Sequence, residues 1–147
     1  MLERPITHRG TIYPWQCDHM GHMNVMWYAG KFDEASWQLM SLLGLTRERL
    51  LLSRTGMAAI EQTTRYKREL HAGDLITVRT VVLEVKQKTF RMFHEMLNDV
   101  TGEIAAECEI VAVHFHLDQQ KSLPLPEEVR QRAAALVPDE ALELCVS

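Results

Sequence analysis

One long segment with helical periodicity stands among segments that have the pattern of strands. Across residues 25–43, apolar side chains recur at three- and four-residue steps, which predicts a helix of about five turns with one apolar face. Asn24 is a suitable N-cap, and Gly44 follows where a helix commonly ends. The predicted apolar face comprises Val25, Tyr28, Ala29, Phe32, Ala35, Ser36, Leu39, Leu42 and Leu43. Whatever the rest of the chain forms has to pack against this one helix.

The remaining segments are rich in β-branched and aromatic residues and are separated by turn residues, so they predict strands. We expect five strands, at residues 7–15, 57–67, 75–85, 89–97 and 103–117. In the last of these, Ile110 and Ala112 should face one side of the sheet, and Val111 and Val113 the other. Residues 127–136 predict a short polar helix, followed by a weakly anchored tail.

This order of elements predicts an α+β fold in which an antiparallel sheet wraps one helix. A chain of 147 residues fits a single domain, which we place at residues 1–147. One helix cannot cover both faces and both edges of a wide sheet, so we expect another copy of the chain to cover part of it.

Composition excludes several classes of protein. The formal net charge of -4 disfavours a general nucleic-acid-binding protein. No apolar run has the length of a membrane-spanning helix, and the first residues lack the apolar stretch of a secretory signal. We therefore expect a cytoplasmic protein with no nucleic-acid or membrane partner.

Neither cysteines nor histidines predict a metal site or a bound cofactor. The three cysteines are an odd number and have no Cys-x-x-Cys spacing, so neither a disulfide framework nor a zinc site is indicated. Two pairs of histidines have no thiol or carboxylate at a diagnostic spacing. These pairs are His19 with His22, and His114 with His116.

The loop before the helix carries the strongest chemical signal. Asp18 lies a few residues before the helix, where the first-turn amides of Val25 and Met26 are expected to be unpaired and the dipole is positive. A carboxylate attacks a carbonyl or activates water, while such amides polarise the carbonyl oxygen. This arrangement predicts acyl-transfer chemistry. On spacing alone, a loop aspartate that only caps or turns the chain is an equal alternative.

A family resemblance favours the catalytic alternative. The pattern Asp18-x-x-Gly21-His22-x-Asn24-x-x-x-Tyr28, followed by Phe32-x-Glu34-Ala35, resembles the hot-dog-fold acyl-CoA thioesterases of the 4-hydroxybenzoyl-CoA thioesterase type. Residues 66–74 are also similar to the segment that opens the third strand in that family. The resemblance covers residues 7–118 and leaves out the C-terminal helix and tail at 124–147.

The resemblance implies a fold, an assembly and a set of site residues. Members have a five-stranded antiparallel sheet around the helix, form homodimers with a continuous sheet and often homotetramers, and bind acyl-CoA between two subunits. Asp18 would be the nucleophile or general base, and Val25 and Met26 would supply the amides. The other implied substrate contacts are Gly21, His22, Asn24, Trp27, Tyr28 and Trp15. The phosphates of coenzyme A would meet the basic turn at Lys86, Lys88, Thr89 and Arg91, which is otherwise a solvated turn.

Two departures from the family pattern affect these expectations. Gln16 stands where many members carry a second acid, which leaves Asp18 as the single acid of the loop. Ser36 stands where many members have arginine, which puts inherited substrate specificity in doubt. Aromatic residues around the loop, Trp15 and Trp27 among them, suggest a cage for a quaternary ammonium group, and some relatives act on betainyl-CoA.

Two other functions stay open on the same architecture. A hot-dog hydratase typically sets aspartate and histidine five residues apart with Asn-Pro between them, whereas Asp18 and His22 are four apart with no proline. A non-catalytic acyl-CoA-binding protein would use the same helix mouth without turnover.

Overall fold

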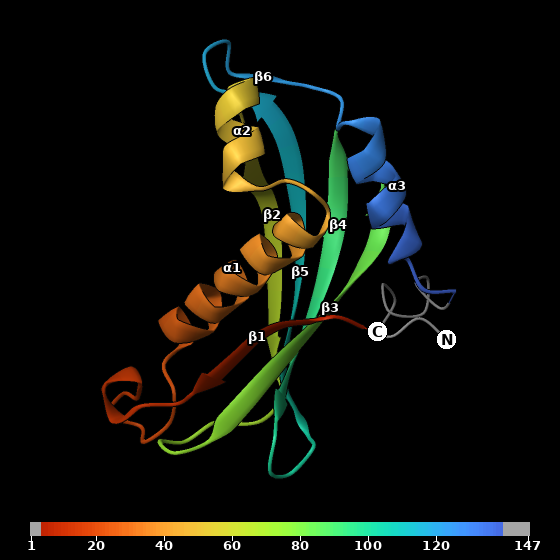
Figure 1. Ribbon diagram of the computed structural model, residues 1–147. Coiled ribbons are helices and arrows are strands. Elements are labelled where there is room, and N and C mark those ends of the chain that lie inside the picture. The colour runs from red at the N-terminus through yellow and green to blue at the C-terminus, as the bar shows by residue number, and fades with distance from the viewer. Residues whose placement is uncertain (1–3, 140–147) are drawn as a thin grey trace.

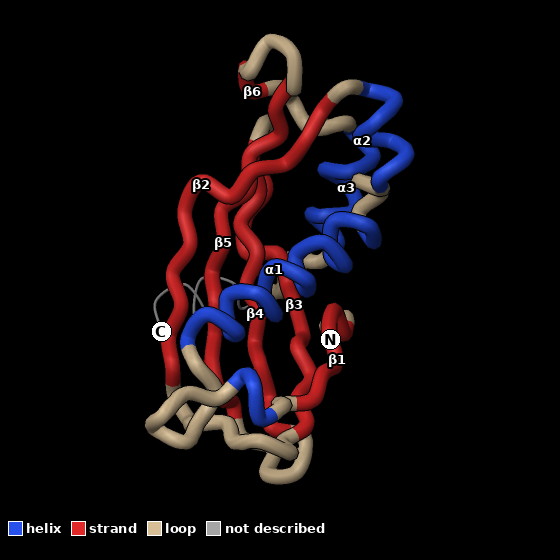
Figure 2. Tube along the Cα trace, turned by 90° about the vertical axis from the view of Figure 1, so that its left-hand side faces the viewer, coloured by secondary structure: helices blue, strands red, loops and turns tan. Residues whose placement is uncertain are grey.

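A curled antiparallel sheet wraps a central helix in the computed structural model, which describes residues 4–139 (Figure 1). The elements are β1 (Ile6–Thr11), a 3-10 turn (Pro14–Gln16), α1 (Val25–Leu42), α2 (Arg47–Ser53), β2 (Thr55–Tyr66), β3 (Leu75–Val85), β4 (Thr89–Asn98), β5 (Ile104–His116), β6 (Lys121–Ser122) and α3 (Glu127–Ala135). The strand order is β1-β3-β4-β5-β2, with the two-residue β6 paired to β5. In the side view, α1 lies against one face of this sheet (Figure 2). The predicted α+β wrapping of one helix is confirmed.

The ends of α1 are set by the residues that the sequence singled out. The Met26 N–H donates to Asn24 Oδ1 at 3.1 Å, so Asn24 is the N-cap. Gly44 follows the helix with φ +94°, a conformation that glycine adopts without the cost of a side chain.

The buried face of α1 differs in part from the predicted apolar face. Tyr28, Phe32, Ala35, Ser36, Leu39 and Leu43 are buried as expected. Val25 and Leu42, by contrast, are more than half exposed, and Ala29 is exposed as well. Lys31 and Met40 take their place among the buried residues. Val25 and Leu42 are the first and last residues of α1, while β1, β3 and β4 contact the helix.

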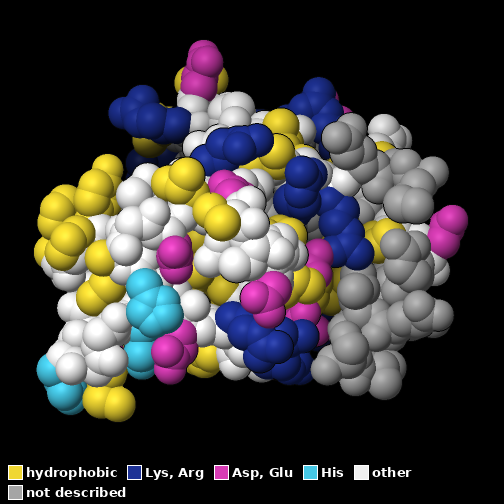
Figure 3. All heavy atoms as spheres, turned by 90° about the horizontal axis from the view of Figure 1, so that it is seen from below, with side chains coloured by type: hydrophobic (Ala, Val, Ile, Leu, Met, Phe, Trp, Pro, Cys, Tyr) yellow, Lys and Arg dark blue, Asp and Glu magenta, His cyan; other side chains and the backbone are white. Residues whose placement is uncertain are grey.

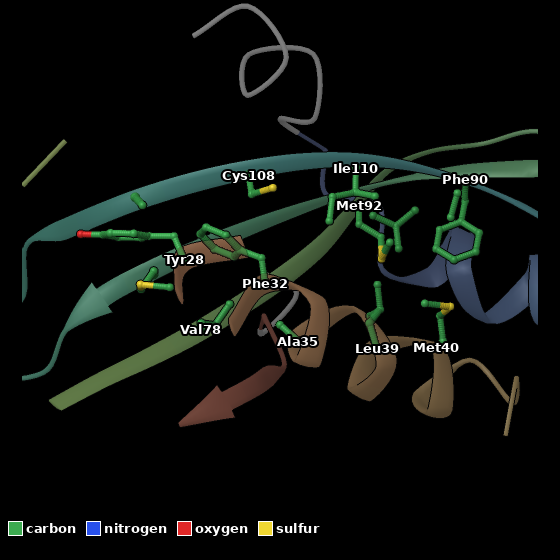
Figure 4. Packing of buried hydrophobic residues seen from close by; sticks show 14 of the residues in the cluster. Tyr28, Phe32, Ala35, Leu39, Met40, Val78, Phe90, Met92, Cys108 and Ile110 are labelled. Carbon is green, nitrogen blue, oxygen red and sulfur yellow. The ribbon is translucent and has the colours of Figure 1, made fainter. Parts of the chain in front are cut away.

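The core lies between α1 and the concave face of the sheet. Phe32 and Leu39 of α1 point toward Val78, Met92 and Ile110 of three different strands (Figure 4). All five side chains are buried, and each contributes about 2 kcal/mol from removing apolar surface from water. This packing holds the helix firmly over the middle of the sheet.

The strands match their predicted positions with one clear exception. The predicted strand at 7–15 ends at Thr11, because a 3-10 turn starts at Pro14, which has no N–H to donate to a sheet. The Tyr13 N–H donates instead to Gln16 Oε1 at 2.9 Å. In β5, Ile110 and Ala112 are buried while Val111 and Val113 are less so, which confirms the predicted alternation.

Two short elements were not predicted. The helix α2 has seven residues, starts at the N-cap Thr46 and ends at Arg54 in the left-handed region, with φ +56°. The strand β6 has two residues, which is too short to give a periodic signal. The predicted helix at 127–136 is confirmed as α3, whereas most of the predicted tail, with Cys145, lies outside the described residues. Among residues 4–139, no helix has the length and apolar character needed to span a membrane.

A row of polar side chains crosses the core beneath α1. Thr7 Oγ1 lies 2.7 Å from Thr80 Oγ1, which lies 2.6 Å from His94 Nδ1. On the other side of the ring, Ser36 Oγ lies 2.9 Å from His94 Nε2 and donates to the carbonyl oxygen of Phe32 at 2.9 Å. With the Ser36 hydroxyl donating to that carbonyl, the tautomer that satisfies the whole row has the proton on His94 Nε2, and Nδ1 accepts from Thr80. Burial lowers the pKa of His94 to about 3, so its ring is neutral at ordinary pH.

Candidate active site

The loop between the 3-10 turn and α1 is a tight hairpin. Cys17 and Met23 form an isolated antiparallel bridge, and the Asp18 N–H donates to the carbonyl of His22 at 3.1 Å. Between them the chain reverses at Gly21, which has φ +87° and donates its N–H to the carbonyl of Asp18 at 3.0 Å. Gly21 is therefore needed for the turn. This hairpin fixes Asp18 beside the start of α1.

The carboxylate of Asp18 accepts two hydrogen bonds and remains partly open to solvent. The Met20 N–H donates to Oδ1 at 2.9 Å, and the Asn24 side-chain amide donates to Oδ2 at 3.0 Å. The Asn24 bond, and then the Met20 bond, hold the pKa of Asp18 below its ordinary value. Asp18 is therefore ionised at neutral pH, as a nucleophile or general base requires.

The amides of the first helical turn are only partly free. The Met26 N–H is already bound to Asn24 Oδ1, because an asparagine N-cap satisfies the second amide of its helix. The expectation of a free Met26 amide is therefore wrong in this structure. The Trp27 N–H donates to the Asn24 carbonyl at 3.0 Å. The Val25 N–H has no partner among residues 4–139, so of the two predicted donors it is the one available to a ligand.

A pocket of about 240 Å³ adjoins the start of α1. Its lining comes from the loop, from the first turn of α1 and from the end of β2, and consists of His22, Met23, Val25, Tyr28, Tyr66, Lys67, Arg68 and Glu69. Asp18 is not part of this lining; it lies on the loop side of the helix start. Histidine, acidic and basic side chains gather at this end of the molecule, which Figure 3 shows from below.

Tyr28 belongs both to the core and to this pocket. Its ring is 4% exposed and packs edge-on against Tyr66, with 5.1 Å between ring centroids. Burial raises the pKa of Tyr28 to about 12, so its hydroxyl stays protonated. Tyr28 is therefore a core residue that also lines the pocket, and its contact with a ligand stays a prediction.

The tryptophans of the predicted cage do not line this pocket. Trp15 stacks on Tyr13 with 4.4 Å between ring centroids and is 68% exposed. Trp27 packs against the hydrophobic core. Trp37 lines a separate pocket of about 60 Å³ near the middle of α1.

Three of the four residues predicted to bind the phosphates of coenzyme A line one small pocket, and the fourth, Lys88, does not. Lys86, Thr89 and Arg91 line a small pocket of about 30 Å³ together with Glu84, Phe90 and Val111. Lys86 lies 3.3 Å from Glu84, and Arg91 lies 3.4 Å from Glu109. Lys88 is not in this lining and donates instead to Ser122 at 3.4 Å.

Tyr66 and Glu69 are pocket residues that the sequence did not single out. They belong to the segment at 66–74, which was similar to the family but carried no predicted site residue. Their place beside α1 depends on the end of β2 reaching the helix start, which no local pattern encodes. Within the described part of the chain, no cluster of three metal-ligating side chains is found.

Comparison with known proteins agrees with this architecture. A curated relative, the betainyl-CoA thioesterase of Pseudomonas aeruginosa, is 27% identical over 130 residues, which are 88% of this chain and 82% of that protein. A Staphylococcus aureus protein solved in complex with CoA superposes with a TM-score of 0.85 at 20% identity, covering 97% of this chain and 94% of that one. A 1,4-dihydroxy-2-naphthoyl-CoA thioesterase from Synechocystis has a TM-score of 0.78 at 17% identity, covering 89% and 96%.

These two structures share the fold, a helix wrapped by a curled antiparallel sheet. The sequence profile of the thioesterase-like superfamily matches residues 12–133, a span that runs from the end of β1 to α3 and includes the loop with Asp18. The chain therefore belongs to the thioesterase-like superfamily and is a hot-dog enzyme of the acyl-CoA thioester hydrolase class.

Proposed function

We propose that Asp18 carries the chemistry of this acyl-CoA thioesterase. The observation that supports it most is the double use of Asn24, whose amide nitrogen binds the Asp18 carboxylate while its oxygen caps α1. The ionised acid and the start of the helix are thereby held at a fixed separation. A thioester carbonyl placed between them would meet a negative oxygen on one side and the positive end of the helix on the other.

Two routes fit this geometry. Asp18 either attacks the thioester carbon, forming a mixed anhydride and releasing the CoA thiolate, or removes a proton from a water molecule that attacks the same carbon. In both routes the negative charge that develops on the carbonyl oxygen is stabilised by the free N–H of Val25. In the first route, water then hydrolyses the anhydride to the free acid.

The proposed substrate is betainyl-CoA. The betainyl-CoA thioesterase of Pseudomonas aeruginosa, which matches 88% of this chain, supports this choice over aromatic or fatty acyl groups. The basic turn at Lys86, Thr89 and Arg91 lies at the end of β3 away from the Asp18 loop, so coenzyme A would reach the turn of a second subunit. The ion pairs of Lys86 with Glu84 and of Arg91 with Glu109 would have to loosen first.

The proposed assembly is a homodimer, and at a higher level a homotetramer. The strand β2 is an edge strand of twelve residues with Ile60 62% exposed, which is a surface that a second copy would cover. The exposed Trp37 and Leu42 of α1 add to the apolar surface available for such a contact.

A panel of acyl-CoA esters with a thiol-release assay tests the function. Betainyl-, butyryl- and benzoyl-CoA should release CoA thiol, with betainyl-CoA fastest. Crotonyl-CoA separates the alternatives, since a hydratase adds water to it without releasing thiol. Binding of all esters with no thiol release would leave a non-catalytic acyl-CoA-binding protein in place of the proposal.

A further inference from the structure

We infer that the pocket formed by Tyr28, Tyr66 and Glu69 is the binding site for a positively charged acyl group and selects such acyl-CoA esters over neutral ones. This inference rests on the proposed thioesterase function and deepens it, because it assigns specificity to residues at the end of β2. The pocket differs from the tryptophan cage suggested by the sequence, since Trp15 and Trp27 are not among its lining residues.

Two aromatic side chains line the pocket, the exposed Tyr66 and the largely buried Tyr28. Tyr28 comes from α1 and Tyr66 from β2, and their rings meet at 85°. Figure 4 shows the Tyr28 hydroxyl pointing away from Phe32 and out of the core, toward the end of the molecule where the pocket lies. A quaternary ammonium group binds aromatic faces by cation–π attraction and needs no hydrogen-bond donor or acceptor.

The charges around the pocket leave one carboxylate without a permanent cation. Lys67 and Arg68 line the pocket, but their cationic heads pair with acids outside it: Lys67 Nζ lies 2.8 Å from Glu107, and Arg68 Nε lies 2.9 Å from Glu103. Among residues 4–139, the basic side chains within 4 Å of the Glu69 carboxylate are two histidines, His22 at 3.9 Å and His71 at 3.6 Å. Within the described part of the chain, no lysine or arginine pairs with Glu69, so this carboxylate is available to a cationic ligand.

The position of the pocket fits the reach of a short acyl chain. Val25, whose N–H is the free donor at the helix start, is itself a lining residue. With the thioester oxygen on that N–H, the acyl group points into the pocket, and a charge two bonds beyond the carbonyl carbon lies against its aromatic walls. Asp18 stays on the loop side, where the Asn24 side chain holds it next to the same helix start.

A pair of isosteric substrates tests the inference on the full-length enzyme. Betainyl-CoA and 3,3-dimethylbutanoyl-CoA have the same shape, but the first carries a quaternary nitrogen where the second has a carbon. The measured quantity is the ratio of their kcat/KM values. Wild-type enzyme should favour betainyl-CoA by about tenfold or more.

Variants then assign the preference to residues. Glu69→Gln should lower the ratio by about tenfold, and Tyr66→Leu by about threefold, whereas Tyr66→Phe keeps the aromatic face and should keep the ratio. Glu127→Gln, on α3 far from the pocket, removes one carboxylate elsewhere and should leave the ratio unchanged.

The outcomes separate the inference from the function on which it rests. A wild-type enzyme that hydrolyses both esters at equal rates overturns the inference and leaves the thioesterase standing. The same conclusion follows if folded Glu69→Gln enzyme keeps the wild-type ratio. If wild-type enzyme releases thiol from neither ester nor from any other acyl-CoA, the proposed function itself fails.

Discussion

Two polar clusters lie on the same helix and behave in opposite ways. In the middle of α1, Ser36 joins His94 and Thr80 in a buried row, and both ring nitrogens of His94 are hydrogen-bonded to hydroxyls of the protein. At the start of α1, Asn24 joins Asp18 in a cluster that is open to solvent and carries a full negative charge. Both clusters contain groups that catalyse reactions in other enzymes, but the pocket at the helix start has about 240 Å³, whereas the one that Ser36 lines has about 60 Å³.

The contrast shows that access and charge, more than residue type, separate a structural cluster from a reactive one. His94 is fully enclosed, and burial keeps it neutral, so it serves the packing of α1 on the sheet. Asp18 is held ionised by donors that do not enclose it. Ser36, which departs from the family pattern, belongs to the enclosed cluster and lies at a core position.

The largest effect should come from removing the charge at the open cluster. Asp18→Asn keeps the size of the side chain but removes the nucleophile or base, so turnover of betainyl-CoA should fall by at least about a hundredfold. The melting temperature should change little, because the loop side chain is not part of the core. A folded variant with wild-type turnover would assign the chemistry to another residue.

The next largest effect should come from the enclosed cluster. His94→Leu leaves the Ser36 and Thr80 hydroxyls with fewer partners, and it should cost about 2 kcal/mol of unfolding free energy in urea titrations at pH 7. Substitution of the exposed His71 by leucine is the matched control and should change stability by less than about 0.5 kcal/mol.

The same variant predicts a pH dependence with a definite sign. The pKa of His94 is lowered from 6.5 to about 3, so between these values the unfolded chain binds a proton that the folded chain does not. Wild-type stability therefore falls as pH drops below 6.5, by at most about 1.4 kcal/mol per pH unit, and His94→Leu lacks this slope. Equal slopes in the two proteins would show that His94 is protonated in the folded state.

Asn24→Ala should have a smaller effect, which appears both in stability and in the pH profile of activity. Asn24→Ala removes the cap of α1 and should cost about 1 kcal/mol of stability. It also removes the strongest stabiliser of the Asp18 carboxylate, whose pKa then rises toward its ordinary value. Since activity needs the ionised acid and is lost as pH falls through that pKa, the acid limb of kcat/KM should move to higher pH. An unmoved acid limb would contradict the role given to Asn24.

The smallest effect should appear at the basic turn. Lys86→Gln should raise KM for acyl-CoA about threefold with kcat unchanged, because an exposed charge contributes little. Acyl-pantetheine esters, which lack the nucleotide phosphates, should show no difference between variant and wild type. Arg47→Gln on α2 serves as a control for the loss of one positive charge.

Local signals made much of the fold predictable. Asn24 and Gly44 fixed the ends of α1 because capping depends on residues next to each other in sequence. Which side of α1 is buried was only partly predictable, because periodicity finds an apolar stripe without indicating how far the sheet reaches around it. Val25 and Leu42 are exposed because they are the first and last residues of α1.

The candidate site also combines contacts that are local in sequence with contacts between distant segments. Asp18 and Asn24 lie within one short loop, and the local turn at Gly21 brings them into contact. Tyr66 and Glu69 reach the start of α1 only through the sheet, and His94 meets Ser36 across 58 residues of chain. Such long-range pairings depend on strand order and register, which a single sequence does not display.

Asn24 also constrains how this sequence can evolve. Its two side-chain atoms serve different partners, so no replacement can improve the folding of α1 at this position without altering the acidity of Asp18. Serine or aspartate would cap equally well but would withdraw the amide donor that the carboxylate uses. A lineage that replaces this residue therefore changes the cap of α1 and the acidity of Asp18 in a single step.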